Sequence, residues 1–179
     1  MAEPLHIFGY GSLIWHPGFA YETRQVARLS GYHRSFCMWS THYRGTMTDP
    51  GLVLALDRAD GARCDGVAFC VADGDAADTL DYLRTRELIS SAYAEMVLPV
   101  QLADGLTVQA VTYVVNRDHS QYCCGLSLGE QARIIAHSSG LRGRNDEYLF
   151  NTVAHLAELG ISDPDMADLA GKVRQIAGS

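Results

Sequence analysis

Apolar and polar residues alternate in short runs along the first part of the chain, a pattern typical of β-strands. The predicted strands cover residues 5–8, 24–40, 51–56 and 66–71. A polar segment at residues 41–50 predicts a loop, and Asp60-Gly61 predicts a turn between the last two strands. The N-terminal part of the chain is therefore expected to be mostly β-structure.

The spacing of the apolar residues becomes helical after residue 73. Ala76, Leu80 and Leu83 fall at positions i, i+4 and i+7, so a helix is predicted from residue 73 to about residue 88. Strand-forming residues then return on both sides of Asp104-Gly105. They predict a hairpin made of residues 93–102 and 107–116.

Helical patterns fill the last third of the chain. Ser127 and Glu130 form a capping-box pattern at the start of one helix. Asn145 is expected to cap a second helix, and Asp163 with Pro164 to begin a third. Because the strands precede a group of helices, the pattern predicts an α+β fold. A curved antiparallel sheet or a small barrel is expected at its centre.

Composition and charge restrict the class of protein. The chain has 179 residues, 47% of them hydrophobic, and is expected to form one domain over residues 1–179. Its formal net charge is -7 and it has no run of Lys and Arg, which argues against a nucleic-acid partner. No apolar run approaches the roughly 20 residues of a membrane span, and no secretory signal pattern opens the chain. The five cysteines lack the spacing of a disulfide framework, so a reducing cytoplasm is the expected location.

The segment Gly9-Tyr10-Gly11-Ser12-Leu13 directly follows the first predicted strand. Glycine lets a ligand approach the main chain closely, and a strand that stops at such a turn directs several N–H groups at one spot. The segment lacks the third glycine of a dinucleotide fingerprint and the flanking glycine of a nucleophile elbow, which excludes both motifs. A backbone nest for an anion or oxyanion is predicted, with a tight strand-end turn as the alternative.

Glu87 continues the apolar face of the predicted helix, four residues after Leu83. Burial disfavours an ionised carboxylate, and the C-terminal end of a helix disfavours negative charge, so a pKa raised toward neutrality is expected. A carboxyl group of this kind suits proton transfer. The alternative is a structural ion pair with Arg84 or Arg86.

Three further side chains are candidates for substrate binding. Arg44 lies in the polar loop and suits bidentate recognition of a substrate carboxylate. Tyr113 and Tyr148 are candidate hydrogen-bond donors to a substrate, with core packing as the alternative. The seven histidines show no metal-ligand spacing, so no metal site is predicted.

Several motifs occur in order along nearly the whole chain. They are FGYGSLIW at residues 8–15, GYHRSF at 31–36, STHYRGT at 40–46, GVAF at 66–69, YLRTRE at 82–87, GRNDEYL at 143–149 and LGI at 159–161. Together these motifs resemble the ChaC family of γ-glutamylcyclotransferases. The residues at 88–92 that separate Glu87 from Tyr93 resemble the bacterial branch of that family, which leaves the finer substrate preference open.

The resemblance implies a small mixed β-barrel with peripheral helices. It also implies cleavage of a small-molecule substrate, glutathione, to 5-oxoproline and cysteinylglycine without a cofactor. In the family, the loop that corresponds to Tyr10, Gly11, Ser12 and Leu13 holds the γ-glutamyl group. The essential glutamate corresponds to Glu87, which is then the general acid and base.

Two alternative functions stay open at this point. The first is a cyclotransferase that acts on other γ-glutamyl amines or γ-glutamyl amino acids. The second is a non-catalytic regulator of a cation antiporter, because the family has carried a cation-transport label. A core-facing glutamate favours catalysis, since an interaction module does not need one.

Overall fold

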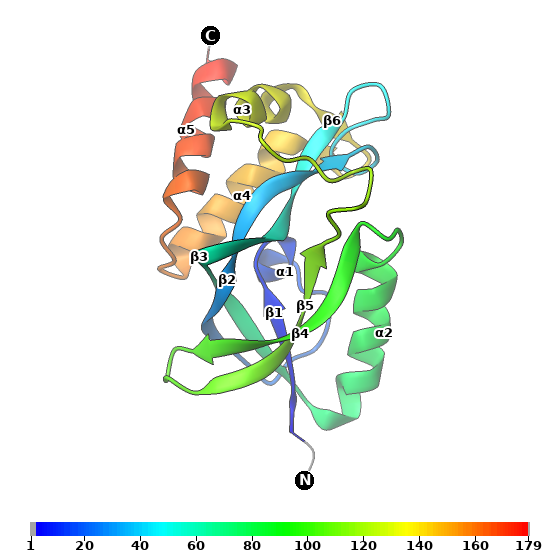
Figure 1. Ribbon diagram of the computed structural model, residues 1–179, viewed down its shortest axis with the longest axis vertical. Helices are drawn as coiled ribbons and strands as arrows, with labels where there is room; N and C mark the ends of the chain where they lie inside the picture. The colour runs from blue at the N-terminus through cyan, green and yellow to red at the C-terminus, as the bar shows by residue number, and fades with distance from the viewer. Residues whose placement is uncertain (1–2, 179) are drawn as a thin grey trace. The chain divides into compact units, whose positions relative to one another are not determined.

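The computed structural model describes residues 3–178 as two compact units (Figure 1). The first unit contains residues 3–34 and 56–119, and the second contains residues 35–55 and 120–178. The chain passes from one unit to the other inside two long strands and once more after residue 119. The prediction of one domain over residues 1–179 stays a prediction.

Five strands form a closed barrel in the order β1-β3-β2-β4-β5, with an additional pairing of β3 and β5. Their bounds are β1 Leu5–Gly9, β2 Thr23–Ser40, β3 Gly51–Val71, β4 Tyr93–Leu102 and β5 Thr107–Val115. Strand β1 runs antiparallel to β3 and parallel to β5, whereas β4 and β5 form the expected antiparallel hairpin. The prediction of an α+β fold with a small mixed barrel and peripheral helices is confirmed.

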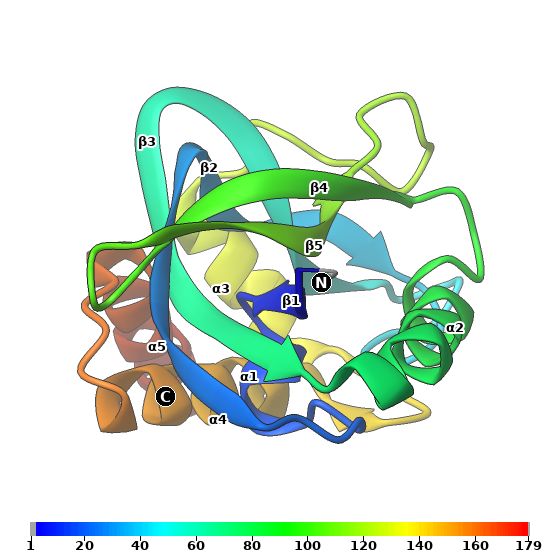
Figure 2. The ribbon, with the colours of Figure 1, turned by 90° about the horizontal axis from the view of Figure 1, so that it is seen from below.

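Strand β3 corrects the prediction of two short strands separated by a turn. It is one continuous strand of 21 residues, and Figure 2 shows its ribbon bending without a break. Gly61 has a φ of +78°, a backbone conformation that glycine adopts without strain. A glycine of this kind kinks a strand while the neighbouring residues stay in the ladder. Asp60-Gly61 therefore marks a bend within one strand.

Two helical elements of the first unit flank the strands that carry the candidate residues. The short helix α1, Ser12–Trp15, follows β1 after two residues. Helix α2, Ala76–Glu87, follows a single 3-10 turn at Asp73–Asp75 and confirms the helix predicted after residue 73. Leu83 is fully buried, as the apolar face of α2 requires. Hydrogen bonds from Arg84 to Glu95 hold α2 alongside β4.

The second unit contains the helices of the last third of the chain, and α3 packs against both α4 and α5 (Figure 1). Their bounds are α3 Leu128–His137, α4 Asn145–Glu158 and α5 Pro164–Ala177, with the short strands β6 Ser139–Gly140 and β7 Gly143–Arg144 before α4. The capping box of Ser127 and Glu130 is present, and Asp163 caps α5. None of the helices formed by residues 3–178 is long and apolar enough to cross a membrane.

Asn145 corrects another prediction, because it does not cap α4. Arg144 occupies the N-cap position, and Asn145 is the first helical residue. The Asn145 side-chain amide instead accepts a hydrogen bond from the Leu52 N–H at 2.8 Å and donates one to the Leu52 carbonyl at 2.8 Å. Both backbone groups of Leu52 are buried, so this amide supplies the partners that a neighbouring strand would give.

Candidate functional site

The loop after β1 is held in place at both of its ends. Tyr10 is buried, its hydroxyl donates to the Tyr113 carbonyl oxygen at 3.0 Å, and its own carbonyl accepts from Arg34 at 2.8 Å. Leu13 and Ile14 anchor the other end because both side chains are buried. The loop therefore has a defined backbone conformation that does not depend on a ligand.

Short helix α1 determines which way the backbone groups of this loop point. The Ile14 N–H donates to the Gly11 carbonyl at 2.9 Å, and the His16 N–H donates to the Ser12 carbonyl at 2.7 Å. The N–H groups of the first turn of any helix have no intrahelical acceptor. In α1 these groups belong to residues 11–13, the segment for which the sequence predicts a backbone nest. That role stays a prediction.

Glu87 is the last residue of α2, and its side chain is only 19% exposed. One carboxylate oxygen lies 3.4 Å from Nε of Arg86, so an ion pair with the neighbouring arginine is present. Arg84 instead binds Glu95 through two hydrogen bonds of 2.9 Å. The carboxylate thus lies on a largely buried face, as expected, beside a cation that can hold its orientation.

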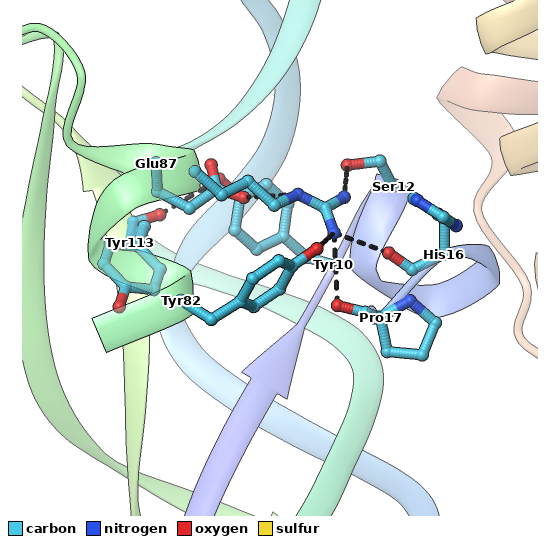
Figure 3. A network of polar contacts seen from close by, with 8 residues as sticks. Tyr10, Ser12, His16, Pro17, Tyr82, Glu87 and Tyr113 are labelled. Carbon is cyan, nitrogen blue, oxygen red and sulfur yellow. Dashed lines mark hydrogen bonds and ion pairs between the residues drawn. The ribbon is translucent and has the colours of Figure 1, made fainter. Parts of the chain in front are cut away.

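The guanidinium of Arg86 connects the Glu87 carboxylate to the loop after β1 (Figure 3). Its terminal nitrogens donate to the Ser12 hydroxyl at 3.0 Å, the His16 carbonyl at 2.6 Å, the Pro17 carbonyl at 3.1 Å and the Tyr82 hydroxyl at 3.2 Å. Two segments whose contacts with Arg86 span 69 to 74 residues of sequence on one side and the neighbouring helix residues on the other therefore meet at one side chain. Figure 3 shows Tyr10 and Tyr113 in the same close-up as Glu87.

Tyr113 lies on β5 and its ring is buried. Its hydroxyl donates to the Glu95 carboxylate at 3.0 Å. Burial raises the pKa of Tyr113 well above its ordinary value, and the negative charges of Glu95 and Glu87 raise it further. The hydroxyl therefore stays protonated at neutral pH, and its oxygen keeps lone pairs that can accept a hydrogen bond.

The Arg84–Glu95 pair has a testable effect on stability. Hydrogen bonds from Arg84 lower the pKa of Glu95, with partial burial opposing and Tyr113 assisting. A carboxylate with a lowered pKa stabilises the fold above its unfolded-state pKa of about 4.3, and this contribution is lost as the pH falls through the folded-state pKa. We expect E95Q to be less stable than the wild type at pH 7, with the difference shrinking toward pH 3. Urea unfolding midpoints at both pH values measure this, and a difference of equal size at both would contradict it.

Arg44 and Tyr148 both belong to the second unit. Both residues are buried, and the Arg44 guanidinium lies 5.4 Å from the centre of the Tyr148 ring. Burial lowers the pKa of Arg44 from its ordinary value, while Tyr148 and Glu147 oppose this effect. One nitrogen of Arg44 donates to the Arg144 carbonyl at 3.1 Å. The structure therefore brings these two predicted residues together within their unit.

The central position of Arg86 and the role of Glu95 as the partner of Tyr113 were not predicted from the sequence. Arg86 was predicted only as an alternative ion-pair partner for Glu87. The one signal available was its position next to Glu87, since the contacts with residues 12–17 depend on the tertiary structure. Among residues 3–178, no group of three or more His, Cys, Asp or Glu side chains lies close enough to hold a metal ion.

Comparison with known sequences shows which family this chain resembles. The family profile described as ChaC-like protein matches residues 5–176. A protein of Escherichia coli (strain K12) named glutathione-specific gamma-glutamylcyclotransferase is 35% identical over 173 residues, which cover 97% of this chain and 74% of that protein. A protein of Schizosaccharomyces pombe (strain 972 / ATCC 24843) with the same name is 31% identical over 190 residues, which cover 96% of this chain and 93% of that protein.

Comparison with solved structures agrees on the fold. The crystal structure of a yeast γ-glutamyl cyclotransferase specific to glutathione has a TM-score of 0.88, with 97% of each chain covered. At 23% identity this similarity shows a shared fold. The family profile and the relatives above 30% identity extend the relationship to the sequence itself. The chain belongs to the ChaC-like protein family.

Proposed function

We propose that this chain cleaves glutathione into 5-oxoproline and cysteinylglycine, with Glu87 as the general base and acid. The observation that carries the proposal is the shared guanidinium of Arg86, which contacts both the Glu87 carboxylate and the Ser12 hydroxyl. This contact supports the proposal because it joins the carboxylate to the loop that we expect to hold the γ-glutamyl group. The relatives named as glutathione-specific cyclotransferases support glutathione as the substrate.

The reaction is an acyl transfer within the substrate. The α-amino nitrogen of the γ-glutamyl group attacks the side-chain amide carbon, a five-membered lactam closes, and the bond to the cysteinylglycine nitrogen breaks. No cofactor is consumed, because the nucleophile and the leaving group are both parts of the substrate. The protein must fold the substrate so that the amine meets the carbonyl carbon, a proximity effect of up to several kcal/mol.

Glu87 supplies the proton transfers in this proposal. The α-ammonium group must lose a proton before it attacks, and the leaving nitrogen must gain one. A single carboxylate beside the reacting atoms does both in turn, first as a base and then as an acid. Tyr113 assists by accepting a hydrogen bond from the α-amino group, because its own proton is donated to Glu95.

The loop of residues 10–13 holds the γ-glutamyl group and the developing oxyanion. Its contribution comes from the N–H groups of Gly11, Ser12 and Leu13, which stabilise the negative charge of the tetrahedral intermediate. The Tyr10 hydroxyl is already committed to the Tyr113 carbonyl. The buried ring of Tyr10 and its carbonyl, which accepts from Arg34, fix the start of the loop.

A substrate panel tests the proposed function. We expect 5-oxoproline release from glutathione at a higher kcat/KM than from γ-Glu-Ala or γ-Glu-Lys. The reason is that a site for glutathione also has contacts for its cysteinylglycine part. A higher kcat/KM for γ-Glu-Ala or γ-Glu-Lys would show that glutathione is not the preferred substrate. Absence of 5-oxoproline from all of them would overturn the enzymatic proposal.

We expect Arg44 to bind the carboxylate at the glycine end of glutathione, with Tyr148 beside it. Arg44→Ala then removes a charged hydrogen bond made equally in the ground state and the transition state. It should raise KM by about 10- to 100-fold and change kcat little. Steady-state kinetics with glutathione measure the two constants separately. A fall in kcat at unchanged KM would contradict this role.

We also propose a cytoplasmic location and a small-molecule partner. The five cysteines are present as thiols, and two of them, Cys37 and Cys64, are buried. Cysteines in the thiol form fit a reducing compartment. The proposed substrate is itself a thiol that persists there.

A further inference from the structure

The Arg86 side chain is much less exposed to solvent than that of Arg84, the other arginine of α2. It is 9% exposed, whereas that of Arg84 on the same helix is 49% exposed. A buried guanidinium costs free energy unless its N–H donors find acceptors. Arg86 has five neighbouring acceptors, four of them in hydrogen bonds of 3.2 Å or shorter. Each of the three guanidinium nitrogens has at least one of these acceptors: Nε faces Glu87, one terminal nitrogen faces Ser12, and the other faces His16, Pro17 and Tyr82.

The acceptors come from two separate parts of the first unit. Tyr82 and Glu87 belong to α2 itself, whereas the Ser12 hydroxyl and the carbonyls of His16 and Pro17 belong to the segment that contains α1. A planar fork of donors fixes the direction of each acceptor as well as its distance. The side chain therefore fixes the Ser12 loop and the Glu87 carboxylate relative to each other.

We propose that Arg86 is a positioning residue of the reaction, holding the Glu87 carboxylate and the loop of residues 10–13 at their working separation. The proposal rests on the proposed function for the role of Glu87. The Glu87 carboxylate and the N–H groups of residues 11–13 must act on the same γ-glutamyl group. The distance between them therefore has to stay constant. A displacement of about 1 Å in such a site can cost 100-fold in rate.

Kinetics of Arg86→Met and Arg86→Lys, measured with glutathione well below the unfolding temperature of each variant, test this role. We expect R86M to lower kcat by about 100-fold with a smaller change in KM. R86K keeps the charge but loses the five-donor fork, so its kcat should lie between those of R86M and the wild type. If folded R86M and R86K both keep kcat within about threefold of the wild type, the positioning role is wrong.

Arg117→Met is the matched control. Arg117 also binds a carboxylate and a carbonyl, at 2.8 Å to Asp57 and 2.7 Å to Arg58, and neither of these acceptors belongs to the residues proposed for the site. We expect R117M to lower the unfolding temperature without lowering kcat. If R117M and R86M lower kcat equally, Arg86 acts through general stability and the proposal fails.

Amide hydrogen exchange separates this inference from the proposed function, because it needs no turnover. We expect the amides of residues 11–15 to exchange faster in R86M than in R117M at equal global stability. If the wild type releases no 5-oxoproline but this difference appears, the proposed function fails and the structural part of the inference stands. Equal exchange in both variants would overturn the inference whatever the activity of the wild type.

Discussion

Glu87→Gln is expected to lower 5-oxoproline release from glutathione by about 10²–10⁴-fold while the protein stays folded. The amide keeps the size of the side chain but cannot accept the proton of the α-ammonium group or return one to the leaving nitrogen. The loss should fall on kcat, because the proton moves only in the transition state. Single-turnover and steady-state assays of 5-oxoproline measure it, and circular dichroism checks the fold.

Asp81→Asn is the matched control for this substitution. Asp81 lies on the same helix as Glu87, is exposed and changes charge in the same way. We expect D81N to keep the activity of the wild type. An E87Q variant with turnover near that of the wild type would remove Glu87 from the mechanism and require another base.

Local patterns predicted the starts of α3 and α5 well because both helices carry their own start signal. The capping box of Ser127 and Glu130 and the Asp163 cap depend on neighbours within three residues, so tertiary structure is not needed to recognise them. The hairpin around Gly105 is equally local. These elements followed from residues close in sequence.

Elements that depend on distant partners were not predicted. The bend in β3 at Gly61 looks like a chain reversal in the sequence, because glycine with aspartate marks both features. Asn145 looks like a helix cap, but Leu52, 93 residues away, takes its amide. For Asn145, a partner far away in sequence selected one of two locally acceptable roles.

The candidate site divides in the same way. Glu87 and the loop of residues 10–13 were predicted from periodicity, glycine content and a family resemblance. Arg86 was predicted only as an alternative ion-pair partner of Glu87, and its contact with Ser12 was not predicted, because the two residues are 74 positions apart in sequence. A short motif identifies residues that carry chemistry, whereas the residues that position them appear only once the chain is folded.

Gly66 links the barrel to the loop through a close backbone contact. It lies in β3, which pairs with β1 in the register Gly9↔Val67. A Cβ atom at Gly66 would lie 2.4 Å from the Gly9 carbonyl oxygen and 2.9 Å from Cζ of Phe8. Gly9 is the last residue of β1, so the oxygen that would have to move belongs to the backbone directly before Tyr10.

Gly66→Ala is therefore expected to lower both stability and activity. Overpacking of this kind costs about 1–3 kcal/mol, and the displaced Gly9 carbonyl carries the strain into residues 10–13. We expect a lower unfolding temperature and, in the fraction that stays folded, a lower kcat/KM for glutathione. Gly74→Ala is the control, because a Cβ atom there meets nothing within 4 Å and both properties should be retained. A G66A variant as stable and active as G74A would show that the close contact between β3 and β1 does not position the loop.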